Sequence, residues 1–404
     1  MHDVLAGLRV VEAASFIAAP SSGLPLAQLG AEVIRIDPIG GGPDYRRWPL
    51  TPEGASLYWE GLNKGKKSIA IDLGRPEGRV LVQRLAAAAG DDAGLFITNF
   101  PADGFLAHAN LAALRPDIIT LRIMGWSDGT PAVDYTVNAA MGIPLMTGPP
   151  SLGDAPVNNV LPTWDLLAGA YGAFTLLAAA RRRTATGEGA EIKLPLGDLA
   201  AATLGHLGQL AEVLLSGSDR PRLGNDLFGA FGRDFVTGDG HRIMVVAITA
   251  RQWSALLAAL GLAPAIAALE AELGVSFASD EGLRYRHRAR LFAIFAPAFA
   301  AHSLTGLALL LNSAGATWAP YRTVAEAAAA RDRFGLGVAG MDTIMQPSGH
   351  RYPAPGAAAE FATLPRLPVA PAPRLGQHTD EILASVLGMA EHEVARLHDK
   401  GLVA

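Results

Sequence analysis

The first part of the chain alternates short β-branched apolar runs with helix-forming stretches. The runs predict strands at residues 8–12, 32–37, 68–71, 94–98 and 117–121, with helices at 21–29 and 76–89. This alternation is typical of a mostly parallel sheet covered by helices on both faces. Ligands bind beyond the carboxyl ends of the strands in such sheets, so the loops 38–44, 99–104 and 125–135 are expected to border a site.

The pattern changes after residue 215. A hairpin is expected over 234–246, turning at Gly238-Asp239-Gly240, followed by Ala-rich helices over 252–311. Turns and short strands (335–354), a Pro-rich extended connector (365–373) and two short helices (379–386 and 391–398) follow. We therefore predict an α/β protein with a Rossmann-like parallel-sheet large domain and a smaller α+β domain. The large domain comprises 1–215 and the return segment 335–404, and the small domain comprises 216–334.

Composition narrows the function classes. The 404 residues are 50% hydrophobic with a net charge of −5, and there is no cysteine. Disulfides, thiolate chemistry and cysteine metal sites are therefore excluded, and the lack of a basic stripe disfavours a nucleic-acid partner. No secretory signal is visible, and apolar runs such as 166–180 are shorter than the roughly 20 residues of a bilayer span. We expect a cytoplasmic protein with no membrane partner.

Familiar catalytic motifs are incomplete. The glycines at 40–42 follow a strand but open no helix, so the dinucleotide fingerprint is not met. His392 and His398 miss the spacing of a helical zinc pair, and no Gly-x-Ser-x-Gly elbow occurs. Nicotinamide, metal and serine-hydrolase chemistry are therefore disfavoured.

Asp165 is the leading catalytic candidate. It stands at the head of the apolar, small-residue segment 166–180. At the start of a helix, backbone N–H groups without acceptors and the positive end of the macrodipole favour an ionised carboxylate. A fixed, partly desolvated carboxylate suits covalent catalysis on an acyl group. Because Asp is also a common helix N-cap, its position alone leaves a purely structural role open.

Other candidates lie at predicted strand ends. The stretch 63–68 carries three lysines just before a strand, suited to an anionic group such as a phosphate or to a solvated turn. Asn99 ends another strand beside Phe100, and Tyr135 follows Asp134 at the start of a helix-like stretch.

Taken in order, these features resemble the family III CoA transferases over nearly the whole chain. The landmarks are 7–11, 26–35, 63–72, Asp165 with its helix, 182–189 and 372–383. The resemblance implies ring-shaped subunits in an interlocked homodimer, an acyl-CoA substrate, and no metal or cofactor beyond the CoA moiety of the substrate. It makes Asp165 the nucleophile. It also places Lys66 and Lys67 near the CoA nucleotide, Asn99 and Tyr135 along the CoA channel, and Phe16 and Ile17 beside the thioester arm.

Further stretches favour one branch of that family, which moves CoA from the C1 to the C4 carboxyl of mesaconyl-CoA. They are 37–42, 157–165, 224–235, 318–323 and 364–369. Ile17 replaces a glutamine of the oxalate-using members and no mobile Gly-rich loop is visible, which disfavours oxalate or formate. Val133 stands where the racemase branch has a histidine, which disfavours racemisation.

The expected mechanism passes through a mixed anhydride and an aspartyl-CoA thioester on Asp165. The free diacid must stay bound between the two transfers, which calls for a cationic clamp. Arg46, Arg47, Arg233 and Arg322 are candidates, each beside an aromatic residue or a turn. Two alternatives stay open at this point: intermolecular transfer between a dicarboxylyl-CoA and a free dicarboxylate, and a non-catalytic acyl-CoA-binding protein.

Overall fold

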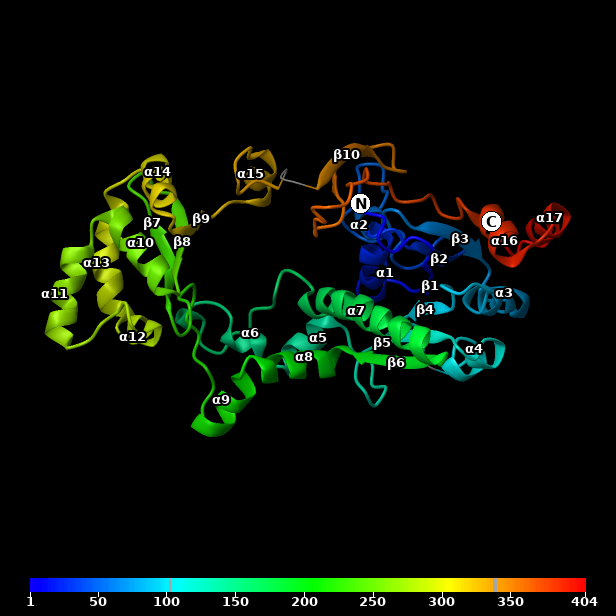
Figure 1. Ribbon diagram of the computed structural model, residues 1–404, viewed down its shortest axis with the longest axis horizontal. Helices are drawn as coiled ribbons and strands as arrows, with labels where there is room; N and C mark the ends of the chain where they lie inside the picture. The colour runs from blue at the N-terminus through cyan, green and yellow to red at the C-terminus, as the bar shows by residue number, and fades with distance from the viewer. Residues whose placement is uncertain (102, 337–339) are drawn as a thin grey trace. The chain divides into compact units, whose positions relative to one another are not determined.

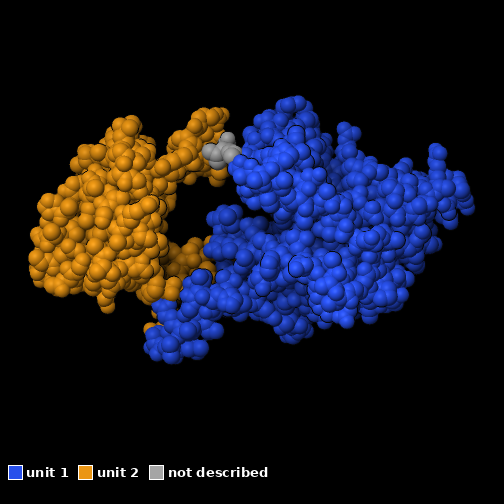
Figure 2. All heavy atoms as spheres, viewed as in Figure 1, with its two compact units in different colours: residues 1–141, 159–217, 339–404 blue, residues 142–158, 218–338 orange. Residues whose placement is uncertain are grey.

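The computed structural model describes residues 1–101, 103–336 and 340–404. Two compact units divide the chain (Figure 2): Met1–Met141, Asn159–Gly217 and Ala339–Ala404 form unit 1, and Gly142–Asn158 and Ser218–Val338 form unit 2. The segment 142–158, which the sequence analysis assigned to the large domain, therefore belongs to unit 2. Arg222 is the reason, because its guanidinium donates to the carbonyl oxygens of Thr147, Gly153 and Ala155.

A six-stranded sheet in the order β3-β2-β1-β4-β5-β6 forms the centre of unit 1 (Figure 1). Its strands are β1 (Arg9–Ala13), β2 (Glu32–Pro38), β3 (Lys67–Ile71), β4 (Leu95–Thr98), β5 (Ile119–Met124) and β6 (Ala190–Pro195). Every pairing is parallel; Val10 of β1, for example, is in register with Val33 of β2 and Leu95 of β4. This is the Rossmann strand order, which confirms the predicted α/β fold class.

Ten helices of the described residues belong to unit 1 together with the sheet. They are α1 (Ala18–Gln28), α2 (Leu57–Leu62), α3 (Pro76–Ala86), α4 (His108–Leu114), α5 (Asp134–Ala140), α7 (Thr163–Thr186), α8 (Leu196–His206), α9 (Gln209–Ser216), α16 (Thr379–Leu387) and α17 (Glu391–Asp399). Ile382, Leu383 and Val394 of the last two helices are buried in one core with Ile69 and Ile71 of β3. The return segment therefore completes the large unit, to which the antiparallel pair β10 (Met341–Met345) and β11 (Arg351–Pro355) also belongs.

Glycines allow α7 to pack unusually close to α1. A Cβ atom added at Gly169 would lie 2.4 Å from the Cβ of Ser21, and one at Gly172 would lie 2.5 Å from the Oγ of Ser22. The small-residue character of 166–180 is thus a packing requirement. It brings the helix that carries Asp165 against the helix that follows Phe16 and Ile17.

Unit 2 is an antiparallel sheet packed against helices. Its strands are β7 (Phe231–Val236), β8 (Arg242–Ala247) and β9 (Thr317–Pro320), in that order. Its helices are α6 (Ile143–Met146), the 3-10 helix η1 (Pro150–Leu152), α10 (Ala250–Leu260), α11 (Ala263–Leu273), α12 (Glu281–Arg286), α13 (Arg288–Ala300), α14 (Leu304–Ala314) and α15 (Val324–Ala329). Phe231, Phe235, Trp253, Phe295 and Phe299 fill the core between sheet and helices, and the predicted hairpin and α+β character are confirmed.

Within the described residues, no single helix has both the length and the apolar character needed to cross a membrane. The bent pairs α8–α9 and α13–α14 reach that length and composition only when each pair is taken together.

Candidate active site

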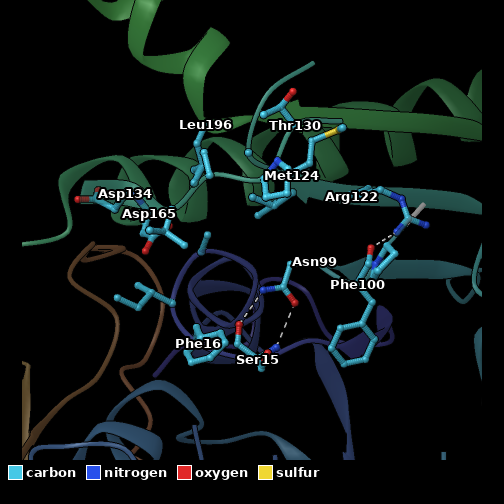
Figure 3. Close-up of a pocket in the computed structure, with 18 of the residues that line it drawn as sticks. Ser15, Phe16, Asn99, Phe100, Arg122, Met124, Thr130, Asp134, Asp165 and Leu196 are labelled. Atoms are coloured by element: carbon cyan, nitrogen blue, oxygen red, sulfur yellow. Dashed lines mark hydrogen bonds between the residues drawn. The ribbon is translucent and has the colours of Figure 1, made fainter. Parts of the chain in front are cut away.

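A cavity of about 790 Å³ opens in unit 1 at the carboxyl ends of β1, β4 and β5 (Figure 3). It lies where the strand order reverses between β1 and β4, the usual ligand position in an open α/β sheet. The described residues that line it are Ser15, Phe16, Ile17, Ala18, Arg47, Asn99, Phe100, Pro101, Asp103, Arg122, Ile123, Met124, Gly125, Gly129, Thr130, Pro131, Ala132, Val133, Asp134, Tyr135, Asp165 and Leu196.

Asp165 lies in the first turn of α7, half-buried, on the wall of this cavity. Burial raises the pKa of its carboxyl to about 7, the negative charge of Asp134 adds to the rise, and Arg47 opposes it. The expectation that the helix start would favour the ionised form is therefore wrong in its net effect. Desolvation and a like charge outweigh the helix terminus, which leaves the carboxyl titrating near neutral pH.

Asp134 holds the start of α7 against α5. Its buried carboxylate oxygen Oδ2 accepts hydrogen bonds from the backbone N–H groups of Trp164 (2.6 Å) and Asp165 (3.2 Å). The indole N–H of Trp164 donates to Asn138 Oδ1 at 3.2 Å, which adds a second tie between the helices. The sequence analysis noted Asp134 beside Tyr135 but gave it no role, because no local pattern shows that it meets a helix 30 residues later.

The end of β4 fixes the loop that follows β1. Asn99 donates from Nδ2 to the carbonyl oxygen of Ser15 (2.8 Å), and its Oδ1 accepts from the N–H of Ser15 (3.1 Å). The next residue, Phe16, has a φ of 63°, a left-handed conformation rare for a bulky residue. Phe16 and Ile17 then form one wall of the cavity. The structure thus brings six predicted site residues to one cavity: Asp165, Phe16, Ile17, Asn99, Tyr135 and Arg47.

Arg47 is the one of the four candidate clamp arginines that lines this cavity. Its guanidinium carbon lies 5.3 Å from the ring centre of Phe16 and 5.4 Å from that of Tyr58. Its carbonyl oxygen accepts from Ser56 Oγ at 2.6 Å. Arg46 of the same loop does not line the cavity.

The two remaining arginines belong to unit 2 and are engaged with carboxylates there. Arg233 lies 3.7 Å from Asp226 and its guanidinium covers the ring of Phe292. Arg322 makes paired hydrogen bonds to both carboxylate oxygens of Asp332, at 3.0 and 2.7 Å.

The predicted lysine pair lies elsewhere. The Lys66 ammonium is fully buried and donates to Glu12 Oε1, Glu12 Oε2 and the Pro20 carbonyl oxygen, each at 2.9 Å. Since an ammonium has three N–H donors, none is left for a phosphate. Lys67 is partly exposed and pairs with Glu32 (2.7 Å) and Glu381 (2.6 Å). Neither lysine lines the cavity.

Arg122 is a cavity residue that the sequence analysis missed. In Figure 3 it lies on the opposite side of the cavity from Asp165, with Asn99 between them. It is buried, and its guanidinium donates to the carbonyl oxygens of Phe100 and Leu106. Desolvation lowers the pKa of Arg122 by more than the nearby carboxylates of Glu191 and Asp103 raise it. The cost of burying this cation is therefore not fully offset within the protein. A charged residue within an otherwise apolar strand was the available sequence signal.

The sequence profile of CoA-transferase family III matches residues 5–379. The chain belongs to this family. The chain is 52% identical over 405 residues to 2-methylfumaryl-CoA isomerase of Chloroflexus aurantiacus, and the aligned region covers 100% of this chain and 98% of that one. It is 29% identical over 414 residues to succinyl-CoA–D-citramalate CoA-transferase of the same organism, covering 98% and 97%.

A solved structure agrees with the family assignment. The crystal structure of a CAIB/BAIF family protein from Brucella suis superposes with a TM-score of 0.75 at 26% identity, covering 96% of this chain and 100% of that one. The resemblance inferred from the ordered sequence landmarks is thereby confirmed, and the protein is an enzyme of the CoA-transferase family III.

Proposed function

We propose that this enzyme moves CoA from the C1 to the C4 carboxyl of mesaconyl-CoA (2-methylfumaryl-CoA), with Asp165 as the nucleophile. The observation that carries the proposal is the pairing of Asp165 and Arg47 in one cavity, a carboxyl able to form acyl intermediates beside a fixed cation. The full-length relative named 2-methylfumaryl-CoA isomerase supports this choice of substrate.

The first transfer puts the acyl group and then the CoA on Asp165. A carboxylate oxygen of Asp165 attacks the C1 thioester carbonyl, the C–S bond breaks, and the CoA thiolate leaves with the electron pair. A mixed anhydride between Asp165 and C1 remains. The thiolate then attacks the Asp165 carbonyl carbon, the anhydride C–O bond breaks, and free mesaconate stays beside an aspartyl-CoA thioester.

The second transfer repeats these steps at the other end of the diacid. The C4 carboxylate attacks the aspartyl thioester and expels the thiolate, which forms a new mixed anhydride. The thiolate attacks the C4 carbonyl and releases the Asp165 carboxylate. Each step converts a thioester into an anhydride or an anhydride into a thioester. The series of steps therefore needs neither ATP nor a metal ion.

Retention of free mesaconate is the requirement that separates isomerisation from intermolecular transfer. In this proposal Arg47 holds whichever carboxylate is not reacting, through the paired N–H geometry of a guanidinium. Its position between Phe16 and Tyr58 restricts the side chain before the substrate binds, which lowers the entropy lost on binding.

The CoA moiety would extend toward the other side of the cavity. Asn99 and Tyr135 line the same cavity, and Arg122 presents a cation that suits a phosphate group of CoA. In this arrangement Arg122 takes the role that the sequence analysis gave to Lys66 and Lys67.

The test is incubation of the purified enzyme with mesaconyl-C1-CoA and isotope-labelled free mesaconate, with separation of thioester isomers by liquid chromatography and mass spectrometry. We expect unlabelled C4 isomer from the wild type and none from Asp165→Ala. Asp198→Asn removes an exposed first-turn carboxylate of α8 and is the matched control expected to remain active. Label in the C4 thioester product would favour the intermolecular transferase instead.

We also propose the interlocked homodimer expected from the family. Helices α8 and α9 leave Leu207, Leu210, Leu214 and Leu215 exposed, and a partner subunit is the natural cover for such an apolar surface. Light scattering coupled to size exclusion should give twice the 42.0 kDa chain mass. A monomer at micromolar concentration would contradict the dimer. The cytoplasmic location stays a prediction.

A further inference from the structure

The catalytic role proposed for Asp165 leaves a second buried carboxylate of the cavity, Asp134, without a chemical assignment. Asp134 is 2% exposed and lies at the first position of α5, while Asp165 lies in the first turn of α7. Figure 3 shows the two carboxylates at the same end of the cavity. The backbone N–H of Asp165 donates a hydrogen bond to Asp134 Oδ2.

We propose that Asp134 is a positioning residue for the nucleophile, which fixes the first turn of α7 and presents a second negative charge to the Asp165 carboxyl. This inference rests on the proposed function of Asp165. The geometric part is direct, because the two N–H groups that Asp134 accepts come from Trp164 and from Asp165 itself. Any movement of Asp134 therefore moves the backbone that carries the nucleophile.

The charge also acts on the covalent steps. When Asp165 becomes an acyl anhydride or a CoA thioester, it loses its negative charge, and the repulsion with Asp134 disappears. Asp134 therefore disfavours the free Asp165 carboxylate relative to both acylated forms. A carboxylate destabilised in this way is also the more basic, and hence more reactive, nucleophile.

The charged and titratable groups that face Asp165 come from three other segments. Asp134 belongs to α5, Tyr58 to α2, and Arg47 to the loop before α2. Arg47 is the opposing influence, since its positive charge lowers the pKa of Asp165 while burial and Asp134 raise it. Removal of Asp134 should leave Arg47 dominant among the charges.

The test uses Asp134→Asn, whose amide oxygen can still accept the two N–H groups but carries no charge. In the free enzyme labelled with ¹³C at aspartate side-chain carboxyls, Asp165 is assigned by its loss in Asp165→Asn and titrated by NMR. We expect titration near pH 7 in the wild type, a shift of at least about one unit downward in Asp134→Asn, and no shift in Asp198→Asn. An unchanged titration in a folded Asp134→Asn would overturn the proposal.

Because this titration needs no substrate, its result is independent of whether the enzyme isomerises mesaconyl-CoA. A second measurement addresses the hydrogen bonds. Asp134→Ala leaves the N–H groups of Trp164 and Asp165 without this acceptor, so kcat should fall by at least about tenfold with KM changing less than about threefold. Near pH 8, Asp134→Asn should have a kcat much closer to the wild-type value than Asp134→Ala has. Equal kcat in the wild type and a folded Asp134→Ala would argue against positioning.

Discussion

The ammonium of Lys66 lies 2.9 Å from both carboxylate oxygens of Glu12, and both side chains are fully buried. Arg35 lies 3.5 Å from the same carboxylate and pairs with Asp37 and Asp44 at 2.8 Å each. Asp44 in turn accepts the backbone N–H of Arg47 on its carbonyl oxygen at 3.2 Å. The buried network therefore connects the first three strands of the chain to the loop that carries the proposed clamp.

Loss of Lys66 should act on folding rather than on CoA affinity. Lys66→Met leaves Glu12 buried with one cation instead of two, and we expect the free energy of unfolding to fall by about 3–5 kcal/mol, measured by urea denaturation. Lys67→Met removes only partly exposed ion pairs and should change that free energy by less than about 1 kcal/mol. A raised KM for acyl-CoA in a Lys66→Met protein of unchanged stability would instead restore Lys66 as a CoA ligand.

Asp165 should weaken the fold at neutral pH. Its folded-state pKa is raised from 3.8 to about 7, so the folded protein binds this proton more tightly than the unfolded chain does. The contribution of this protonated carboxyl to the free energy of unfolding is fully present below pH 3.8 and is lost as the pH rises through about 7. At pH 8 the free energy of unfolding of Asp165→Asn should therefore exceed that of the wild type by about 1–3 kcal/mol. This range is reduced to allow for partial exposure of the side chain.

Urea denaturation of both proteins at pH 8 and pH 4.5 checks this. The advantage of Asp165→Asn should shrink at the lower pH, because the wild-type carboxyl is then protonated in the folded state. An advantage of the same size at both pH values would mean that it comes from packing and not from ionisation.

Arg47 should control whether the intermediate acid escapes. Arg47→Ala removes the proposed contact to the unreacted carboxylate, and we expect kcat/KM to fall by about 10²-fold, equivalent to about 3 kcal/mol. Free mesaconate should also accumulate in single-turnover experiments followed by mass spectrometry. Arg46→Ala, in the same loop but outside the cavity lining, is the control and should retain the wild-type product ratio. Unchanged retention of mesaconate in Arg47→Ala would assign the clamp to another group.

The close approach of α1 and α7 should tolerate no side chain at Gly169. In Gly169→Ala the new methyl would lie 2.4 Å from Ser21 Cβ and 3.0 Å from the Ser21 backbone carbon. The helices must separate, at a cost of about 1–3 kcal/mol, which exceeds the roughly 1 kcal/mol that Ala contributes to helix formation. Gly205→Ala on α8 meets no atom within 4 Å and should raise the thermal midpoint slightly. A Gly169→Ala protein as stable and active as the wild type would contradict this packing.

The arrangement of strands explains why part of the site was predictable. Asn99 follows a strand, and parallel strands end at one edge of their sheet, so the periodicity that located β4 also predicted that Asn99 borders a site. Phe16 was expected there only from the family resemblance. The ends of the five predicted strands were displaced by three residues at most, at β5, where Leu121 was expected and Met124 is observed. The sixth strand, β6, was not predicted. The small-residue run after Asp165 likewise predicted the body of α7.

The sequence by itself determined the positions of the first five strands, the helix that carries Asp165, and the family. These depend on neighbours along the chain and on the order of local motifs. The tertiary structure alone decided the charges. Lys66 contacts Glu12, 54 residues away along the chain, and Asp165 contacts Asp134, 31 residues away. No local pattern could therefore show that the hydrogen-bond donors of Lys66 are all used, or that the pKa of Asp165 is raised to about 7. The hydrogen-bond partners of Lys66 and the burial and charged neighbours of Asp165 set those properties, and they exist only once the chain has folded.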